Sequence, residues 1–307
     1  MTKFEFKKRY GQNFLQNEFI ANKIVDSISP SKDDLIIEIG PGAGAITKRL
    51  KKYNSYLIAY EIDEDTKKYL LPLEDAKTKL IYKDFLETDL KQDISSIKYD
   101  NIFIIGNLPY YITTPIIEKV IDSQIMPQSL TIMVQKEVGE RFMASPHTKE
   151  YGYMTVLLNY WFNIEKITDV NKTEFYPMPK VDSMVIKLSK KEAEKIDYKK
   201  FKSILMSSFQ FKRKTIYNNL KTYNKEKLEC ILQKHNATLS SRAEELDLET
   251  FIDLSKNLSW QLNHVYYIIK STFCKDTIFN YVLFHMNNVN FSVVLESRCQ
   301  NFVLKDT

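Results

Sequence analysis

The 307-residue chain has few of the features that mark disulfide, metal or membrane chemistry. Its three cysteines (Cys230, Cys274 and Cys299) are odd in number and widely spaced, which matches neither a disulfide framework nor a metal site. No apolar run is long enough to span a bilayer, and the N-terminus lacks the apolar core of a signal peptide. We therefore expect a cytoplasmic enzyme that uses neither a metal nor a membrane.

Positive charge is in small excess and is unevenly distributed. The net charge of +5 permits an anionic partner without requiring one. Nine basic residues and one acidic residue lie between Lys199 and Lys227, and a smaller cluster, Lys7-Lys8-Arg9, lies near the start. Taken alone, such runs are usually solvated faces. Beside a nucleotide-handling site, they predict a surface that contacts phosphate.

From residue 33 to about 190, short apolar runs alternate with helical segments. This pattern predicts an α/β domain with a mostly parallel sheet covered on both faces. Seven strands are expected, at Leu35–Ile39, Tyr56–Glu61, Lys79–Lys83, Ile102–Gly106, Leu130–Gln135, Ile164–Val170 and Met184–Leu188. Helices are expected at Ala45–Lys52, Pro115–Ser123, Lys136–Ala144 and Tyr151–Phe162. The short connection between the last two strands favours an antiparallel hairpin at the sheet edge.

The chain divides into three predicted parts. Residues 1–190 form the α/β domain, and a polar stretch of lysine and glutamate follows it. Residues 196–260 carry apolar side chains at helical spacing, which predicts a small helical domain. Residues 261–307 contain eight aromatic residues and neither glycine nor proline, and we treat them as an extension of unknown role.

A glycine-rich loop follows the first expected strand. Gly40-Pro-Gly-Ala-Gly44 leads into a helix, an arrangement that lets a nucleotide approach the backbone closely. Glu61 ends the second strand, where a carboxylate can accept hydrogen bonds from ribose hydroxyls. Asp84 ends the third strand, where it could accept a hydrogen bond from an adenine amine or simply cap a turn. The loop alone also fits a NAD enzyme or a tight turn without a ligand.

Gly106-Asn-Leu-Pro-Tyr110, at the end of the fourth strand, indicates the chemistry. The amine of adenine is a poor nucleophile, so a methylating site must accept hydrogen bonds from both of its hydrogens. The Asn107 side-chain oxygen and the Leu108 carbonyl can do so, while Pro109 fixes the turn and Tyr110 offers a face for stacking. Positioning then carries the rate without a metal or a strong base. Phe175 is a candidate for the opposite face of the base, although such a residue more often packs in a core.

Together these residues resemble the ribosomal RNA adenine dimethyltransferase family, of which the erythromycin-resistance methyltransferases are more distant members. The resemblance covers roughly residues 6–258. It rests on Tyr10-Gly-Gln-Asn-Phe-Leu15, Glu38-Ile-Gly-Pro-Gly-Ala-Gly44, Tyr60-Glu-Ile-Asp63, Asn107-Leu-Pro-Tyr-Tyr-Ile-Thr113, Gln135-Lys-Glu-Val138, Phe175-Tyr-Pro-Met-Pro-Lys-Val-Asp-Ser183, Arg213-Lys-Thr-Ile-Tyr-Asn-Asn-Leu220 and Ser241-Arg-Ala-Glu-Glu-Leu246. Tyr111 departs from the pattern, because asparagine is more usual there.

The resemblance implies a Rossmann-like fold of seven strands, the last antiparallel, with a small C-terminal helical domain. It implies S-adenosylmethionine as cofactor, covered by Asn13 and Leu15 and bound by Gly40, Gly42, Glu61, Asp84 and Asn107. It further implies methylation of two adjacent adenines in a hairpin near the 3′ end of small-subunit RNA, within an immature subunit, by a monomer. The residues expected to grip the RNA backbone are Lys212, Arg213 and Lys214.

Three other functions stay open at this point. One is a non-catalytic RNA-binding assembly factor that kept the fold, and another is methylation of a large-subunit adenine that confers macrolide resistance. Gly40-Pro-Gly42, Leu108, Gln135-Lys-Glu137 and the Arg213-Lys-Thr-Ile run favour the small-subunit branch. The third, a NAD oxidoreductase, lacks a candidate for hydride chemistry.

Overall fold

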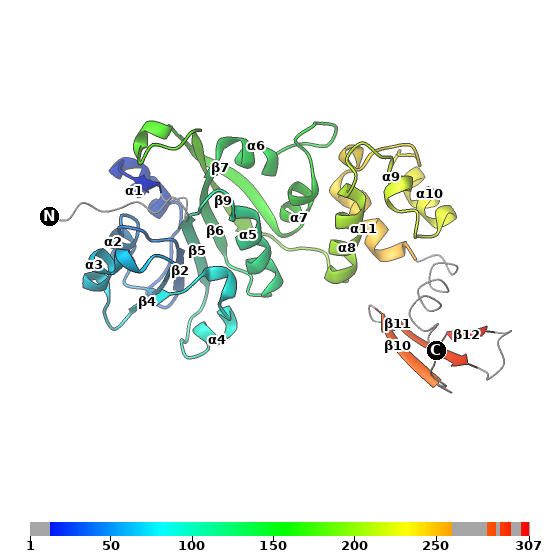
Figure 1. The fold of residues 1–307 in the computed structure, drawn as a ribbon, viewed down its shortest axis with the longest axis horizontal. Coiled ribbons are helices and arrows are strands. Elements are labelled where there is room, and N and C mark those ends of the chain that lie inside the picture. Colours follow the sequence, from blue (N-terminus) through cyan, green and yellow to red (C-terminus); the bar gives the residue numbers. More distant parts are fainter. Residues whose placement is uncertain (1–12, 260–280, 287–288, 296–301, 307) are drawn as a thin grey trace. The chain divides into compact units, whose positions relative to one another are not determined.

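The computed structural model describes residues 13–259, 281–286, 289–295 and 302–306. The Lys7-Lys8-Arg9 cluster therefore lies outside the described residues. The chain forms two compact units: Met1–Ser145 with Leu157–Ala193, and Pro146–Val156 with Glu194–Thr307. Figure 1 shows the elements of both, coloured along the sequence.

The first unit is built on a seven-stranded sheet in the order β4-β3-β2-β5-β6-β9-β7. The strands are β2 (Leu35–Ile39), β3 (Tyr56–Glu61), β4 (Thr78–Tyr82), β5 (Ile102–Asn107), β6 (Ser129–Gln135), β7 (Phe162–Val170) and β9 (Ser183–Lys190). Strands β2 to β6 pair in parallel, whereas β9 is antiparallel to both β6 and β7. This confirms the expected Rossmann-like sheet of seven strands with an antiparallel last strand.

Strand β2 shows why the chain folds this way. All five of its side chains are buried, which is typical of a parallel strand covered on both faces. The strand order reverses direction at β2, because β3 lies on one side of it and β5 on the other. In such sheets ligands bind beyond the carboxyl ends of the strands at this switch point.

The helices of the first unit include α1 (Glu18–Asp26), α2 (Thr47–Leu50), α3 (Lys67–Leu70), α4 (Leu90–Ile94), α5 (Thr113–Asp122) and α6 (Lys136–Phe142). Helix α1 begins where the Asn17 side chain accepts hydrogen bonds from the amides of Phe19 and Ile20. Its buried face includes Ile24 and Val25, which join the core that packs on the sheet. Helix α2 is shorter than predicted, because the Gly44 turn extends to residue 46.

The antiparallel pair predicted at the sheet edge is confirmed. The last two strands pair with each other, with β7 at the edge and β9 between β6 and β7. A two-stranded sheet that the sequence pattern did not indicate joins β1 (Phe14–Leu15) to β8 (Phe175–Tyr176), with Phe14 opposite Tyr176 and Leu15 opposite Phe175. This pair brings the N-terminal segment next to the segment between β7 and β9.

The second unit contains the helices α8 (Tyr198–Phe209), α9 (Ile216–Asn219), α10 (Lys225–Lys234) and α11 (Leu248–Asn257). Its core includes Phe201, Leu205 and Phe251, all without exposed surface. Helix α7 (Tyr153–Trp161) begins in this unit and ends in the first, directly before β7. In the C-terminal extension, β10 (Tyr281–Met286), β11 (Val289–Leu295) and β12 (Phe302–Asp306) form an antiparallel sheet.

Candidate active site

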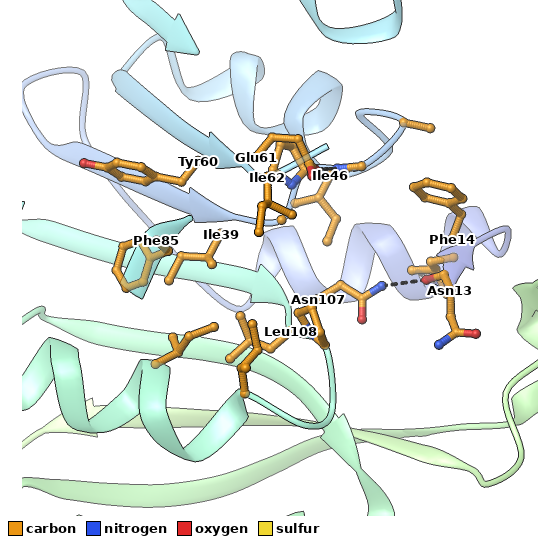
Figure 2. Close-up of a pocket in the computed structure, with 18 of the residues that line it drawn as sticks. Asn13, Phe14, Ile39, Ile46, Tyr60, Glu61, Ile62, Phe85, Asn107 and Leu108 are labelled. Carbon is orange, nitrogen blue, oxygen red and sulfur yellow. Dashed lines mark hydrogen bonds between the residues drawn. The ribbon is translucent and has the colours of Figure 1, made fainter. Parts of the chain in front are cut away.

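A pocket lies at the carboxyl ends of β2, β3 and β5, where the sheet topology predicts a ligand site. Its empty volume is about 1230 Å³, open solvent at the mouth included. Figure 2 shows the residues around it. The pocket is lined by the predicted residues Asn13, Leu15, Gly40, Gly42, Glu61, Asp84, Asn107, Leu108, Pro109 and Tyr110. The structure thus brings together ten predicted residues from five separate segments of the sequence.

The glycine-rich loop adopts a conformation that side chains resist. Gly40, Gly42 and Gly44 have φ values of 71°, 58° and 80°, which lie in the left-handed region. Above Gly42 lies the ring of Phe14, whose Cε1 atom would be 2.5 Å from a Cβ at that position. Residue 42 is therefore glycine for two reasons: its backbone has a positive φ, and the ring of Phe14 lies where a Cβ would be.

The Glu61 carboxylate is fixed by backbone donors on both oxygens. One oxygen accepts the amide of Gly42 at 2.9 Å, and the other accepts the amide of Asp63 at 2.9 Å. Burial raises the pKa of Glu61, and these amide hydrogen bonds offset part of that rise. A carboxylate oxygen can accept more than one hydrogen bond, so both oxygens keep capacity for hydroxyl donors from a ligand.

Asp84 follows β4 and Asn107 ends β5, two strands that lie on opposite sides of β2 in the sheet. One of its carboxylate oxygens accepts the amide of Leu86 at 2.9 Å and so caps the short helix Phe85–Glu87. The residue also lines the pocket. Asp84 can therefore both cap this helix and accept a hydrogen bond from a ligand, because the cap uses only one of its carboxylate oxygens.

Asn107, the last residue of β5, is oriented by the N-terminal segment. Its Nδ2 atom donates to the backbone carbonyl of Asn13 at 3.1 Å, the hydrogen bond drawn as a dashed line in Figure 2. This bond uses one of the two Nδ2 hydrogens, and the side-chain oxygen keeps its capacity to accept a hydrogen bond from a ligand. The contact with Asn13 therefore restrains the Asn107 amide beside the pocket that it lines.

The turn after β5 is closed by hydrogen bonds to Pro109. The Pro109 carbonyl accepts the amide of Ile112 at 3.1 Å and the hydroxyl of Thr113 at 3.3 Å. Leu108 is buried, whereas Tyr110 is half-buried with its hydroxyl 2.7 Å from that of Ser183. Burial raises the pKa of Tyr110, so the phenol stays neutral at ordinary pH.

Phe175 is the one predicted catalytic residue that the structure does not bring to the pocket. Its side chain is 4% exposed and packs in the core with Leu15 and Ile20. Alternation along β8 explains this, because Phe175 points inward and the neighbouring Tyr176 points outward with 54% exposure. Residues that the sequence reasoning missed, among them Phe14, Ile62 and Phe85, do line the pocket.

The predicted RNA-contacting residues lie in the second unit. Lys212, Arg213 and Lys214 are exposed and follow α8 directly, beside the exposed ring of Phe211. The Lys212 ammonium donates to the Lys149 carbonyl, also in the second unit. Among the described residues, no helix is both long and apolar enough to cross a bilayer. No cluster of three or more metal-binding side chains lies in the same part of the chain.

Comparison with known proteins identifies the family. The model of the ribosomal RNA adenine dimethylase family matches residues 3–259. The chain belongs to this family. A ribosomal RNA small subunit methyltransferase A from Aster yellows witches'-broom phytoplasma (strain AYWB) is 42% identical over 255 residues, which cover 81% of this chain and 94% of that protein. A protein of the same name from Clostridium botulinum (strain Kyoto / Type A2) is 39% identical over 263 residues, covering 82% and 94%.

Two solved structures share the fold. A dimethyladenosine transferase from Plasmodium falciparum superposes with a TM-score of 0.63 at 24% identity, covering 78% of this chain and 95% of that one. The 23S rRNA methyltransferase ErmE superposes with a TM-score of 0.60 at 22% identity, covering 80% and 98%. At these identities the likeness shows the fold alone. The two structures therefore do not decide which RNA this chain modifies.

Proposed function

We propose that this chain transfers methyl groups from S-adenosylmethionine to the exocyclic amine of adenine in small-subunit ribosomal RNA. The first unit holds the cofactor and the reacting base, and the helical residues 196–260 contact the RNA backbone. The observation that carries the proposal is the position of Asn107, whose oriented side chain lies between the glycine-rich loop and the Tyr110 turn.

The residues around the pocket fit S-adenosylmethionine. The positive-φ glycines let a ligand approach the backbone, and Glu61 presents a fixed carboxylate where ribose hydroxyls would lie. Asp84 offers a second carboxylate to an adenine amine, and Phe85 and Ile62 supply apolar walls. Asn13 and Leu15 cover this side of the pocket from the N-terminal segment. When bound, the cofactor supplies an electrophilic methyl carbon on a sulfonium.

The other side of the pocket suits a flipped adenine. The Asn107 oxygen and the Leu108 carbonyl accept the two amine hydrogens, which draws the nitrogen lone pair out of the ring and aims it at the cofactor. Tyr110 stacks on the base, and Pro109 holds the turn in place. The chain needs no strong base, because an alkylated amine is acidic enough to lose its proton to water. Geometry and hydrogen bonding therefore carry the rate.

The choice of small-subunit RNA is supported by the two relatives near 40% identity that bear that name. Two adjacent adenines in a 3′-terminal hairpin loop, and a role in maturation of the subunit, follow from the family resemblance. The exposed Lys212, Arg213 and Lys214 supply cations for the phosphate backbone. We propose that the protein acts as a monomer on the immature subunit.

Methyl transfer to purified subunits tests this function. Small subunits and large subunits from a strain lacking the modification would be incubated with the wild type, Asn107→Ala or Tyr110→Ala and labelled S-adenosylmethionine. We expect label in adenine of the small-subunit RNA with the wild type and a loss of at least about 100-fold with either variant. Folding of each variant is checked by its melting temperature.

The other outcomes contradict the proposal in different ways. Label in large-subunit RNA, with a rise in macrolide resistance of expressing cells, would indicate the resistance-type activity. Binding of RNA without detectable binding of S-adenosylmethionine would indicate a non-catalytic assembly factor. Full activity of a folded Asn107→Ala variant would show that the chemistry assigned to this residue is wrong.

A further inference from the structure

Ser183, the first residue of β9, has no role in the function described so far. Its side chain has no exposed surface, and its hydroxyl lies 2.7 Å from the Tyr110 hydroxyl, across 73 residues of sequence. Tyr110 is the residue whose ring is placed to stack on the target base. The hydrogen bond therefore joins the far end of that ring to the sheet.

The position of Ser183 is unusually well fixed. Ser183 pairs with Gln135 at the end of β6 and with Val170 at the end of β7. The preceding residue, Asp182, accepts the amide of Lys136 at 3.0 Å through its carbonyl and the amide of Lys172 at 2.9 Å through its carboxylate. Ser183 is thus held by pairing with the ends of two other strands, which fixes the position from which its side chain extends.

Tyr110 is held less firmly on its own side. Its backbone lies in the turn that the Pro109 carbonyl closes, but the side chain is only half-buried and borders the open pocket. A ring fastened only at its Cα end could change rotamer and leave no flat face for a base. A second attachment at the hydroxyl removes that freedom before the substrate binds, which lowers the entropy lost on binding.

We infer that Ser183 is a positioning residue for the methyl transfer, which fixes the stacking face of Tyr110 through the hydrogen bond between their hydroxyl groups. The inference rests on the proposed function, because the ring matters only if a base stacks on it. This role explains why residue 110 is tyrosine and not phenylalanine, since stacking needs only the ring whereas the bond to Ser183 needs the hydroxyl.

A double-mutant cycle tests the coupling in the full chain. The variants are Ser183→Ala, Tyr110→Phe and both together, each assayed for methyl transfer to unmethylated small subunits. One neutral hydrogen bond corresponds to a loss of about 3- to 10-fold in kcat/KM for RNA. We expect this loss in each single variant, no further loss in the double variant, and an unchanged KM for S-adenosylmethionine.

Ser129→Ala is the matched control, because Ser129 is also a buried serine at the start of a strand of the same sheet, but its hydroxyl has no hydrogen-bond partner among the described residues. It should leave kcat/KM unchanged. Losses that multiply in the double variant, or single variants with wild-type kcat/KM, would overturn the positioning role while the wild type remains active. A wild type that transfers no methyl to RNA would instead overturn the proposed function, and this inference with it.

Discussion

At the scale of single residues, Gly42 is where the glycine-rich loop contacts the N-terminal segment. Its φ of 58° and the ring of Phe14 above it leave no room for a side chain. In Gly42→Ala, the left-handed backbone alone costs about 1 to 2 kcal/mol, and Phe14 must also move. We expect a lower melting temperature and weaker binding of S-adenosylmethionine, by about 10-fold, in a calorimetric titration.

The control for this change is Gly152→Ala. The nearest atom to a Cβ at residue 152 is the Glu150 carbonyl oxygen at 4.0 Å, an ordinary contact. This variant should bind the cofactor as the wild type does. Equal affinities for Gly42→Ala and Gly152→Ala would show that the close approach of Phe14 has no part in holding the cofactor.

Glu38 predicts a pH dependence of stability. Burial raises its pKa from 4.5 to about 8, and the nearby Glu61 adds to the rise. Between these values the folded state keeps a proton that the unfolded state has lost, so the free energy of unfolding falls as pH rises. Glu38→Gln removes this proton and keeps the shape. Relative to the variant, the wild type should lose stability from pH 5 to 8, by up to about 1.4 kcal/mol per pH unit.

Denaturant unfolding of both proteins at several pH values measures this difference. Other titrating groups affect the two proteins alike, so only the gap between the curves matters. A gap that stays constant from pH 5 to 8 would mean that Glu38 carries its charge inside the fold. In that case the side chain must have a partner that the folded chain supplies.

At the scale of elements, the segment from Asn13 to Asn17 forms a strap over the pocket. It is attached to Asn107 by its Asn13 carbonyl and to β8 by pairing. The Glu174 carboxylate accepts from the Asn17 side chain at 2.7 Å, and the Glu174 carbonyl accepts the amide of Gln16 at 2.8 Å. We expect Glu174→Ala to loosen the strap and raise the KM for S-adenosylmethionine by about 3- to 10-fold.

Glu174→Gln separates the hydrogen bond from the charge, because its amide oxygen can still accept from Asn17. Its KM should stay within about twofold of the wild type. If alanine and glutamine raise the KM equally, the negative charge rather than the hydrogen bond holds the strap. If neither changes it, the strap does not cover the bound cofactor.

A second prediction at this scale concerns the exposed basic segment that follows α8. Replacing Lys212, Arg213 and Lys214 together by alanine should weaken RNA binding and flatten its salt dependence. Each lost phosphate contact lowers the slope of log K against log salt by about 0.7 to 0.9. The charge-matched control replaces Lys32, Lys91 and Lys98, which are exposed and precede β2 or β5, away from the carboxyl strand ends. Equal slopes for both triple variants would contradict a specific contact.

The regular elements were predictable from the sequence, and the contacts between them were less so. Apolar runs such as Leu35–Ile39 predicted the strands, because a parallel strand covered on both faces is buried along its whole length. The β1–β8 pair was missed because two-residue strands have no periodicity to detect. The antiparallel pairing of β7 and β9 at the sheet edge was predicted, but the position of β9 between β6 and β7 was not, since a hairpin pattern gives the pairing of two strands and not their other neighbours.

At the scale of the whole molecule, the sequence predicted where the pocket lies but not the long-range contacts that orient the side chains around it. The sheet topology brought Gly40, Glu61 and Asp84 to one edge, as the order of strands predicts. The inward direction of Phe175 depends on the pairing of β8, so the sequence alone could not place it. The hydrogen bonds from Asn107 to Asn13 and from Tyr110 to Ser183 join distant segments, and no local pattern encodes them.

In the proposed function, Asn107 and Tyr110 hold an adenine with its amine facing the methyl donor. Nucleoside mass spectrometry of small-subunit RNA, after a single turnover with the wild type or Asn107→Ala, tests it most directly. We expect N6-methylated adenosine from the wild type and a rate at least about 100-fold lower from the variant. Methylation of another nucleoside, or an equal rate from the folded variant, would contradict it.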